Sequence, residues 1–230
     1  MYDLYIGNKN YSSWSLRPWL LMQHFGIPFR EHLVSVAGRP FNPALKPLAG
    51  NGRVPCLHEA DGFQVWDSLA IIETLAEREP AIWPGEARAR ARARSLCAEM
   101  HAGFTALRSA MPMNLKLRLC GKPAEADVQR DIDRIIEIWT EARSQCAQDD
   151  GPWLFGAFTA ADAMFAPIAC RFDTYNVPLP PLAAAYRDTV LAHPALLAWR
   201  AAALQEREAH AHYDTLAEAY GGPRSIAQGC

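Results

Sequence analysis

Residues 50–75 read GNGRVPCLHEADGFQVWDSLAIIETL, a run in which two short apolar segments flank a turn and a helical pattern follows. The apolar segments are residues 54–57 and 63–66. Asp61-Gly62 between them is typical of a turn, because glycine tolerates positive φ and aspartate bonds to nearby backbone. Residues 69–72 and Leu75 are apolar at helical spacing. The pattern predicts a β-hairpin followed by a helix.

Pro55 restricts where the first of these strands can lie. Proline cannot donate to a β ladder, so Pro55 belongs on an edge strand or at the start of a strand. The N–H and C=O of Val54 could then face outward and pair with an extended peptide ligand. A cis Val54–Pro55 bond would present those groups, but only about 5–6% of X–Pro bonds are cis. The residues alone leave both isomers open.

Asp67-Ser68 stands at the predicted helix start. The first N–H groups of a helix have no partner within it, so they attract a carboxylate together with the helix dipole. The Ser68 hydroxyl would add a further donor. The hairpin and this helix start could therefore hold a short peptide that carries a free carboxylate. The alternative is an ordinary N-cap beside a proline-interrupted edge strand, and caps of this kind are common.

Composition places the chain among globular proteins. It has 230 residues, of which 50% are hydrophobic and 21% charged. The net charge of −2 gives no basic excess for nucleic acid, and no apolar run has transmembrane length. The first residues, MYDLYIGNKN, do not resemble a signal peptide. The six cysteines form no CxxC or Cys/His cluster, so we expect no metal site, no disulfide framework and a reducing, cytoplasmic setting.

The order of elements suggests two domains. Residues 2–6, 12–22, 29–36 and the hairpin with its helix read as a small mixed α/β sheet. Residues 79–85 (EPAIWPG) mark a break, and helical patterns follow over 86–119, 125–146, 159–172, 182–191 and from 193 onward. We expect an α/β domain over 1–80, a linker over 81–86, an all-helical domain over 87–220 and a mobile tail over 221–230.

Ser12 lies where the first strand leads into the first helix. A hydroxyl there is next to free N–H groups and the positive end of the helix dipole, so it could donate to an anion. The alternative is a loop serine or a cap. No His/Asp partner or GxSxG motif accompanies it, which argues against a covalent nucleophile.

Other motifs favour structural roles. Residues 159–162 (TAAD) form a capping box with aspartate in its last position, at the start of an apolar helix. The four alternating arginines over residues 88–94 are typical of a solvated or inter-subunit face. Phe104, Met111 and Met113 could adapt to an apolar ligand, although core packing is their default role.

Together these motifs resemble the cytosolic glutathione S-transferases over almost the whole chain. The resemblance rests on residues 12–17 (SSWSLR), 53–55 (RVP), 67–71 (DSLAI) and 159–162 (TAAD), in this order, and on the change to all-helical structure after residue 80. It implies a thioredoxin-like N-terminal domain and an all-α C-terminal domain. It also implies a homodimer that takes glutathione as cosubstrate and a small apolar electrophile, with no nucleic acid or membrane partner.

The resemblance also implies a set of site residues. Pro55 would be cis and the Val54 backbone would pair with glutathione. The γ-glutamyl group would be held by Asp67 and Ser68, and Arg53 would lie near the glycine end. Ser12 would activate the thiol, since it stands five residues before an arginine as in the serine-type classes, with Ser13 as the fallback. The electrophile would lie between the domains, against Tyr11, Trp14, Phe104, Met111 and Met113.

The free energy needed to activate the glutathione thiol can be calculated. A free thiol has a pKa near 8.5, and lowering it by about two units needs roughly 2.7 kcal/mol of thiolate stabilisation. One hydrogen bond from Ser12 and the helix dipole could supply about that much. The serine run resembles the zeta class, which includes maleylacetoacetate isomerase, but Trp14 replaces that class's cysteine. Conjugation, glutathione-dependent isomerisation or dehalogenation, and a non-catalytic binding module therefore stay open.

Overall fold

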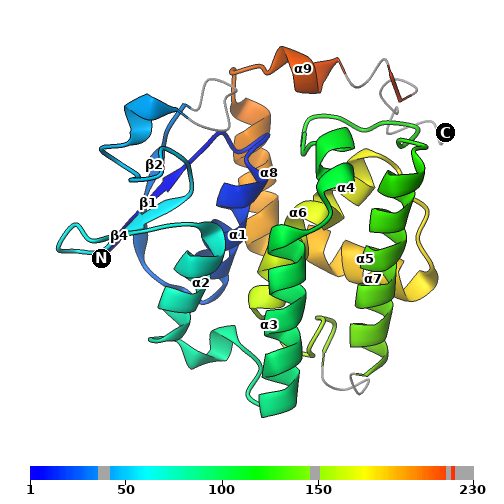
Figure 1. The fold of residues 1–230 in the computed structure, drawn as a ribbon, viewed down its shortest axis with the longest axis horizontal. Helices are drawn as coiled ribbons and strands as arrows, with labels where there is room; N and C mark the ends of the chain where they lie inside the picture. The colour runs from blue at the N-terminus through cyan, green and yellow to red at the C-terminus, as the bar shows by residue number, and fades with distance from the viewer. Residues whose placement is uncertain (36–41, 146–150, 216–218, 221–230) are drawn as a thin grey trace.

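The computed structural model describes residues 1–35, 42–145, 151–215 and 219–220. The N-terminal part contains β1 (Tyr2–Ile6), α1 (Ser13–His24), β2 (Phe29–Leu33), η1 (Pro43–Leu45), β3 (Cys56–His58), β4 (Gln64–Val65) and α2 (Ser68–Ala76). Then follow η2 (Pro80–Ile82), α3 (Ala87–Ala102), α4 (Thr105–Ala110), α5 (Ala126–Ser144), α6 (Ala160–Thr174), α7 (Pro181–Leu191), α8 (Pro194–Gln205) and α9 (Ala211–Asp214). The thioredoxin-like arrangement followed by helices is confirmed (Figure 1). The exact domain and linker boundaries stay predictions, and the expected tail over 221–230 lies outside the described residues.

The four strands form one mixed sheet in the order β2-β1-β3-β4. β1 pairs parallel to β2 and antiparallel to β3, and β3 pairs antiparallel to β4. Pro55 directly precedes β3, and its bond to Val54 is cis. The edge-strand alternative for this proline is wrong, because β3 is an inner strand. Val54 is accessible for another reason: it lies before the point where the ladder begins.

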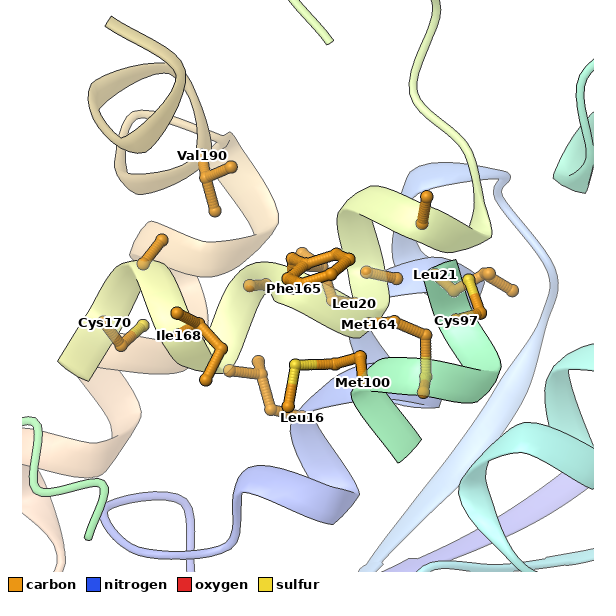
Figure 2. Packing of buried hydrophobic residues seen from close by; sticks show 14 of the residues in the cluster. Leu16, Leu20, Leu21, Cys97, Met100, Met164, Phe165, Ile168, Cys170 and Val190 are labelled. Atoms are coloured by element: carbon orange, nitrogen blue, oxygen red, sulfur yellow. The ribbon is translucent and has the colours of Figure 1, made fainter. Parts of the chain in front are cut away.

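Helix α6 is the centre of the core. Nearly all of its residues are buried, and it contacts α1, α3 and α7. Figure 2 shows Leu16 and Leu20 of α1 and Met100 of α3 around Met164 and Phe165 of α6. The predicted capping box is present at its start. This core joins the N-terminal part of the chain to the helical part.

The helix-rich region over 86–119 contains two helices separated by a sharp break. α3 ends before Gly103, and Phe104 has a positive φ of 57°. A Cβ at Gly103 would lie 2.8 Å from the carbonyl oxygen of Glu99, so only glycine fits there. After α4, no helix forms until residue 126. Helix propensity predicted that this region is helical, but it did not predict the break between α3 and α4.

The cysteines differ from expectation at one position. Cys56, Cys97 and Cys170 are buried free thiols, and burial raises the pKa of Cys56 to about 11 and of Cys170 to about 12. Cys120 is disulfide-bonded, which the sequence analysis did not predict. Among the described residues, no group of three or more His, Cys, Asp or Glu side chains could hold a metal ion. Within the same residues, no helix is both long and apolar enough to span a membrane.

Candidate functional site

A cavity of about 540 Å³ lies where the N-terminal part meets the helices. Its wall includes most of the predicted site residues: Tyr11, Ser12, Ser13, Trp14, Arg53, Val54, Pro55, Asp67, Ser68 and Met113. Segments from residue 8 to residue 213 therefore meet at one hollow. Phe104 and Met111 are not part of the wall.

The start of α2 contributes an unsatisfied hydroxyl. Asp67 caps the helix by accepting a hydrogen bond from the N–H of Leu69 at 3.0 Å. Its other carboxylate oxygen lies 3.0 Å from Nε2 of His101 on α3, which ties the two parts of the chain together. Ser68 is fully buried, and its hydroxyl has no hydrogen-bond partner among the described residues. A buried polar group without a partner costs about 1–3 kcal/mol, so this position is suited to a polar ligand group.

The loop before β3 contributes free backbone. Neither the N–H nor the C=O of Val54 is hydrogen-bonded to any residue that the structure describes. The N–H of Arg53 is taken by Oδ1 of Asn51 at 3.0 Å, and the Arg53 side chain is exposed at the rim. Val54 can therefore pair with an extended peptide in the manner of an added strand.

At the start of α1, two serine hydroxyls are linked. Ser12 is the N-cap residue, but its side chain does not cap the helix. Its Oγ lies 2.8 Å from Oγ of Ser15, which is fully buried and accepts the N–H of Gly7 at 3.0 Å. A Cβ at Gly7 would lie 3.1 Å from Oγ of Ser12, so glycine allows this close approach. The i, i+3 spacing of the two serines was a signal for this pair that the sequence analysis did not use.

Ser13 faces a different neighbour. It is buried, and its Oγ accepts a hydrogen bond from Nη2 of Arg171 on α6 at 3.3 Å. Its hydroxyl is thus engaged with the helical part of the molecule.

The cavity wall also contains aromatic and charged groups. The hydroxyl of Tyr11 donates to Asp214 of α9 at 2.8 Å, and burial together with that carboxylate raises the pKa of Tyr11. The ring of Trp14 lies 5.2 Å from the ring of His101. Arg108 and Arg171 also line this wall. The electrophile side expected from the sequence is therefore not wholly apolar.

Phe104 and Met111 are corrections to the predicted site. The positive φ at Phe104 turns its side chain into the core, where it is 7% exposed. Met111 is fully buried, and its carbonyl accepts a hydrogen bond from Nε of Arg171 at 2.7 Å. Core packing, the default role for both, is what the structure shows. The wall residues missed from the sequence include His101, Arg108, Arg171, His210 and Tyr213.

A C-terminal segment is fixed beside the cavity. The carboxylate of Glu206 accepts the N–H of Lys9 at 2.7 Å and of Asn10 at 2.9 Å. The indole N–H of Trp199 donates to the Lys9 carbonyl at 2.9 Å. These contacts hold the segment after α8 against the loop that precedes Ser12.

Comparison with known proteins agrees with this arrangement. Residues 11–78 match the family described as glutathione S-transferase, N-terminal domain, and residues 125–202 match glutathione S-transferase, C-terminal domain. A maleylacetoacetate isomerase of Pseudomonas aeruginosa is 30% identical over 200 residues, which cover 84% of this chain and 92% of the relative.

Solved structures show the same fold. A glutathione transferase homolog from Burkholderia gl BGR1, crystallised with bound glutathione, aligns with a TM-score of 0.64 at 23% identity, over 89% of this chain and 99% of that one. A glutathione S-transferase from Rhodospirillum rubrum F11 aligns with a TM-score of 0.67 at 22% identity, over 94% and 99%. With both domains matched in order and an isomerase relative along most of its length, the chain belongs to the cytosolic glutathione S-transferase family.

Proposed function

We propose that the protein is a glutathione transferase, which ionises the thiol of glutathione for attack on a small electrophile. One observation carries the proposal. The Ser12 hydroxyl, the Val54 backbone and the Ser68 hydroxyl line one cavity, and the last two have no hydrogen-bond partner among the described residues. A homodimer, expected from the family, is part of the proposal, and a native mass measurement tests it.

The donors suit the parts of an extended tripeptide. The peptide backbone would pair with Val54 as an added strand. The γ-glutamyl carboxylate would accept from Ser68 and the first N–H groups of α2, and Asp67 would accept from its ammonium group. Arg53 at the rim would face the glycine carboxylate. The Burkholderia homolog that was crystallised with bound glutathione supports the choice of glutathione as the ligand.

The serine pair offers a route to the thiolate. A hydroxyl has one donor and two lone pairs. In the structure the Ser12 hydroxyl donates to Ser15, which also accepts the N–H of Gly7. When glutathione binds, both hydroxyls would rotate, so that Ser15 donates to Ser12 and the Ser12 proton points at the glutathione sulfur. The thiol proton then leaves to solvent. The thiolate forms a bond to the electrophilic carbon, and the leaving group departs with its electron pair.

Isomerisation is the second candidate, and two observations favour it. The 30% identical relative is a maleylacetoacetate isomerase, and the guanidinium groups of Arg108 and Arg171 line the cavity together with Trp14. In that reaction the same thiolate would add to a double bond, and later be expelled after rotation, so that no conjugate accumulates. Product analysis distinguishes the two: a stable thioether indicates transfer, and an altered geometry with glutathione recovered indicates isomerisation.

The test of the proposal is an ultraviolet titration of enzyme-bound glutathione. The wild type should show half-ionisation about two units below the free thiol pKa of about 8.5. Ser12→Ala should raise the bound-thiol pKa by about 1–2 units, since a hydrogen bond to a charged group contributes about 1.5–3 kcal/mol. Ser13→Ala, the matched control, should change it far less. Absence of thiolate at neutral pH in the wild type would contradict the proposal.

A further inference from the structure

Three arginines from separate helices lie close enough to repel one another, and two of them contact Trp14. Arg17 of α1 lies with Cζ 4.1 Å from the centre of a Trp14 ring, and Arg108 of α4 lies at 5.2 Å. Arg108 and Arg171 of α6 line the cavity wall. Arg108 also lies near the start of α2, because it donates to the carbonyl of His101, whose ring contacts Asp67.

None of the three arginines has a carboxylate partner in the ranges that the structure describes. Arg171 is buried and donates only to neutral acceptors: the carbonyls of Met111 and Pro167 and the hydroxyl of Ser13. Arg108 donates to the carbonyl of His101 at 3.1 Å. Arg17 is 1% exposed, and its Nε and Nη1 have no hydrogen-bond partner there.

The charges nevertheless persist at neutral pH. Burial first, and then repulsion from Arg171 and Arg108, lowers the pKa of Arg17 to about 9. Burial likewise lowers the pKa of Arg171 to about 10, which still leaves it protonated. A buried charge without an opposite charge is unfavourable, so an anionic group bound beside these arginines would be stabilised.

The nearby acids are engaged elsewhere. Asp131, which faces Arg108, accepts the N–H of Leu107 at 3.0 Å. Asp67 is bonded to His101 and to its own helix. Glu208, at the cavity edge, accepts from Ser35 at 3.0 Å. The missing negative charge must therefore come from a ligand.

We propose that the electrophile of this enzyme carries a carboxylate, bound by Arg171 and Arg108. The inference rests on the proposed function and specifies its substrate class. A planar guanidinium matches a carboxylate by geometry as well as charge. The carboxylates of glutathione have their own proposed donors, at Ser68 and Arg53. Trp14 and Met113 would pack against the apolar part of the same molecule, which corrects the expectation of a purely apolar electrophile.

A matched pair of electrophiles tests the inference: 4-chloro-3,5-dinitrobenzoate and its methyl ester. In both, the glutathione sulfur bonds to the ring carbon, chloride leaves and the thiol proton passes to solvent. The wild type should prefer the acid by at least about tenfold in kcat/KM, the scale of one charge-assisted hydrogen bond. Arg108→Gln should remove about tenfold for the acid and little for the ester, and Arg108→Lys should restore part of it.

Two further variants complete the test. Arg92→Gln makes the same charge change at an exposed position of α3 and should leave the acid-to-ester ratio unchanged. Arg171→Lys keeps the buried positive charge but loses the planar guanidinium, so it should lower the acid-to-ester ratio. The thermal midpoint of this variant checks that the fold is retained. An unchanged ratio in both Arg108→Gln and Arg171→Lys, or a wild type that prefers the ester, would overturn the inference.

A binding measurement separates the two proposals. Enzyme loaded with S-methylglutathione, which cannot react, is titrated with benzoate by calorimetry. The wild type should bind benzoate at least tenfold more tightly than Arg108→Gln, and equal binding would overturn the inference. Failure of the proposed function would give a different result: no thiolate forms and neither electrophile yields a conjugate, regardless of the affinity for benzoate.

Discussion

Helices α2 and α6 begin with similar residues but in different states. At α6, Asp162 is buried and accepts hydrogen bonds from the N–H groups of Leu154 and Thr159 and from the hydroxyl of Tyr186. At α2, the buried hydroxyl of Ser68 has no partner in the described part of the chain. The polar groups at the start of α6 are paired within the protein, whereas the Ser68 hydroxyl at the start of α2 is unpaired and lies at the cavity.

The difference separates a structural cap from a binding site. A structural cap and a binding site cannot be told apart by the short polar residues at a helix start, because such residues can satisfy the helix's unpaired N–H groups in either case. Burial without a partner is the feature that distinguishes them, since a fold leaves a buried polar group unpaired only at a cost. If the comparison is correct, stability and glutathione binding should respond to different helix starts.

Asp162→Ala is the largest expected effect. It leaves three buried donors without an acceptor, and each unpaired donor costs about 1–3 kcal/mol. We expect the free energy of unfolding to fall by about 3 kcal/mol in chemical denaturation. An unchanged midpoint would show that the start of α6 is not held by this carboxylate.

Ser68→Ala should reduce glutathione affinity and leave stability almost unchanged, the opposite of Asp162→Ala. Removing the unpaired hydroxyl should weaken glutathione binding about tenfold, measured by calorimetry, with little change in the unfolding midpoint. The matched variant is Thr159→Ala, which removes the cap hydroxyl of α6 and should lower stability without changing glutathione binding. A destabilised Ser68→Ala with unchanged affinity would break the comparison.

Ser15→Ala tests a smaller contribution from the start of α1. Without the Ser15 hydroxyl, Ser12 loses the partner that would orient its proton toward sulfur. We expect the pKa of bound glutathione to rise by about 0.5–1 unit, less than in Ser12→Ala, while the Kd for glutathione changes little. A purely structural role for Ser15 would lower stability and leave the thiol pKa where it was.

At a third helix start, that of α8, the N-cap residue His193 can accept a backbone N–H only while its imidazole is neutral. Nδ1 of His193 accepts the N–H of Ala195 at 3.2 Å, and Nε2 lies 2.9 Å from Nδ1 of His24. Burial, and then His24, lowers the pKa of His193 to about 4. The unfolded chain therefore binds more protons between about pH 6.5 and 4, and stability should fall as the pH falls through that range.

His193→Asn keeps a capping acceptor and removes the proton site. The pH dependence of the thermal midpoint between about pH 6.5 and 4 should therefore be smaller in this variant than in the wild type. An identical slope would show that the α8 start does not sense protonation.

The sequence predicted the parts of the site that lie in local motifs. Ser12, Val54 and Ser68 each stand at a strand or helix end that turn chemistry and capping rules indicate. Arg108 and Arg171 escaped prediction because their meeting point depends on a tertiary contact between α6 and the residue that ends α4, where Arg171 donates to the carbonyl of Met111. An arginine inside the apolar run of α6 was nevertheless a usable signal, since charge is rare in a buried helix. Phe104 was misplaced because no local rule predicts its positive φ.

The three buried cysteines have a practical consequence for chemical labelling. The thiolate is the reactive form of a thiol, and burial raises the pKa of Cys56, Cys97 and Cys170, so all three stay protonated at neutral pH. Cys56 directly follows Pro55 of the cavity wall, yet an alkylating reagent at neutral pH should leave it unmodified. An electrophilic tag directed to the cavity would then report the sulfur of the ligand and leave these three protein sulfurs unmodified.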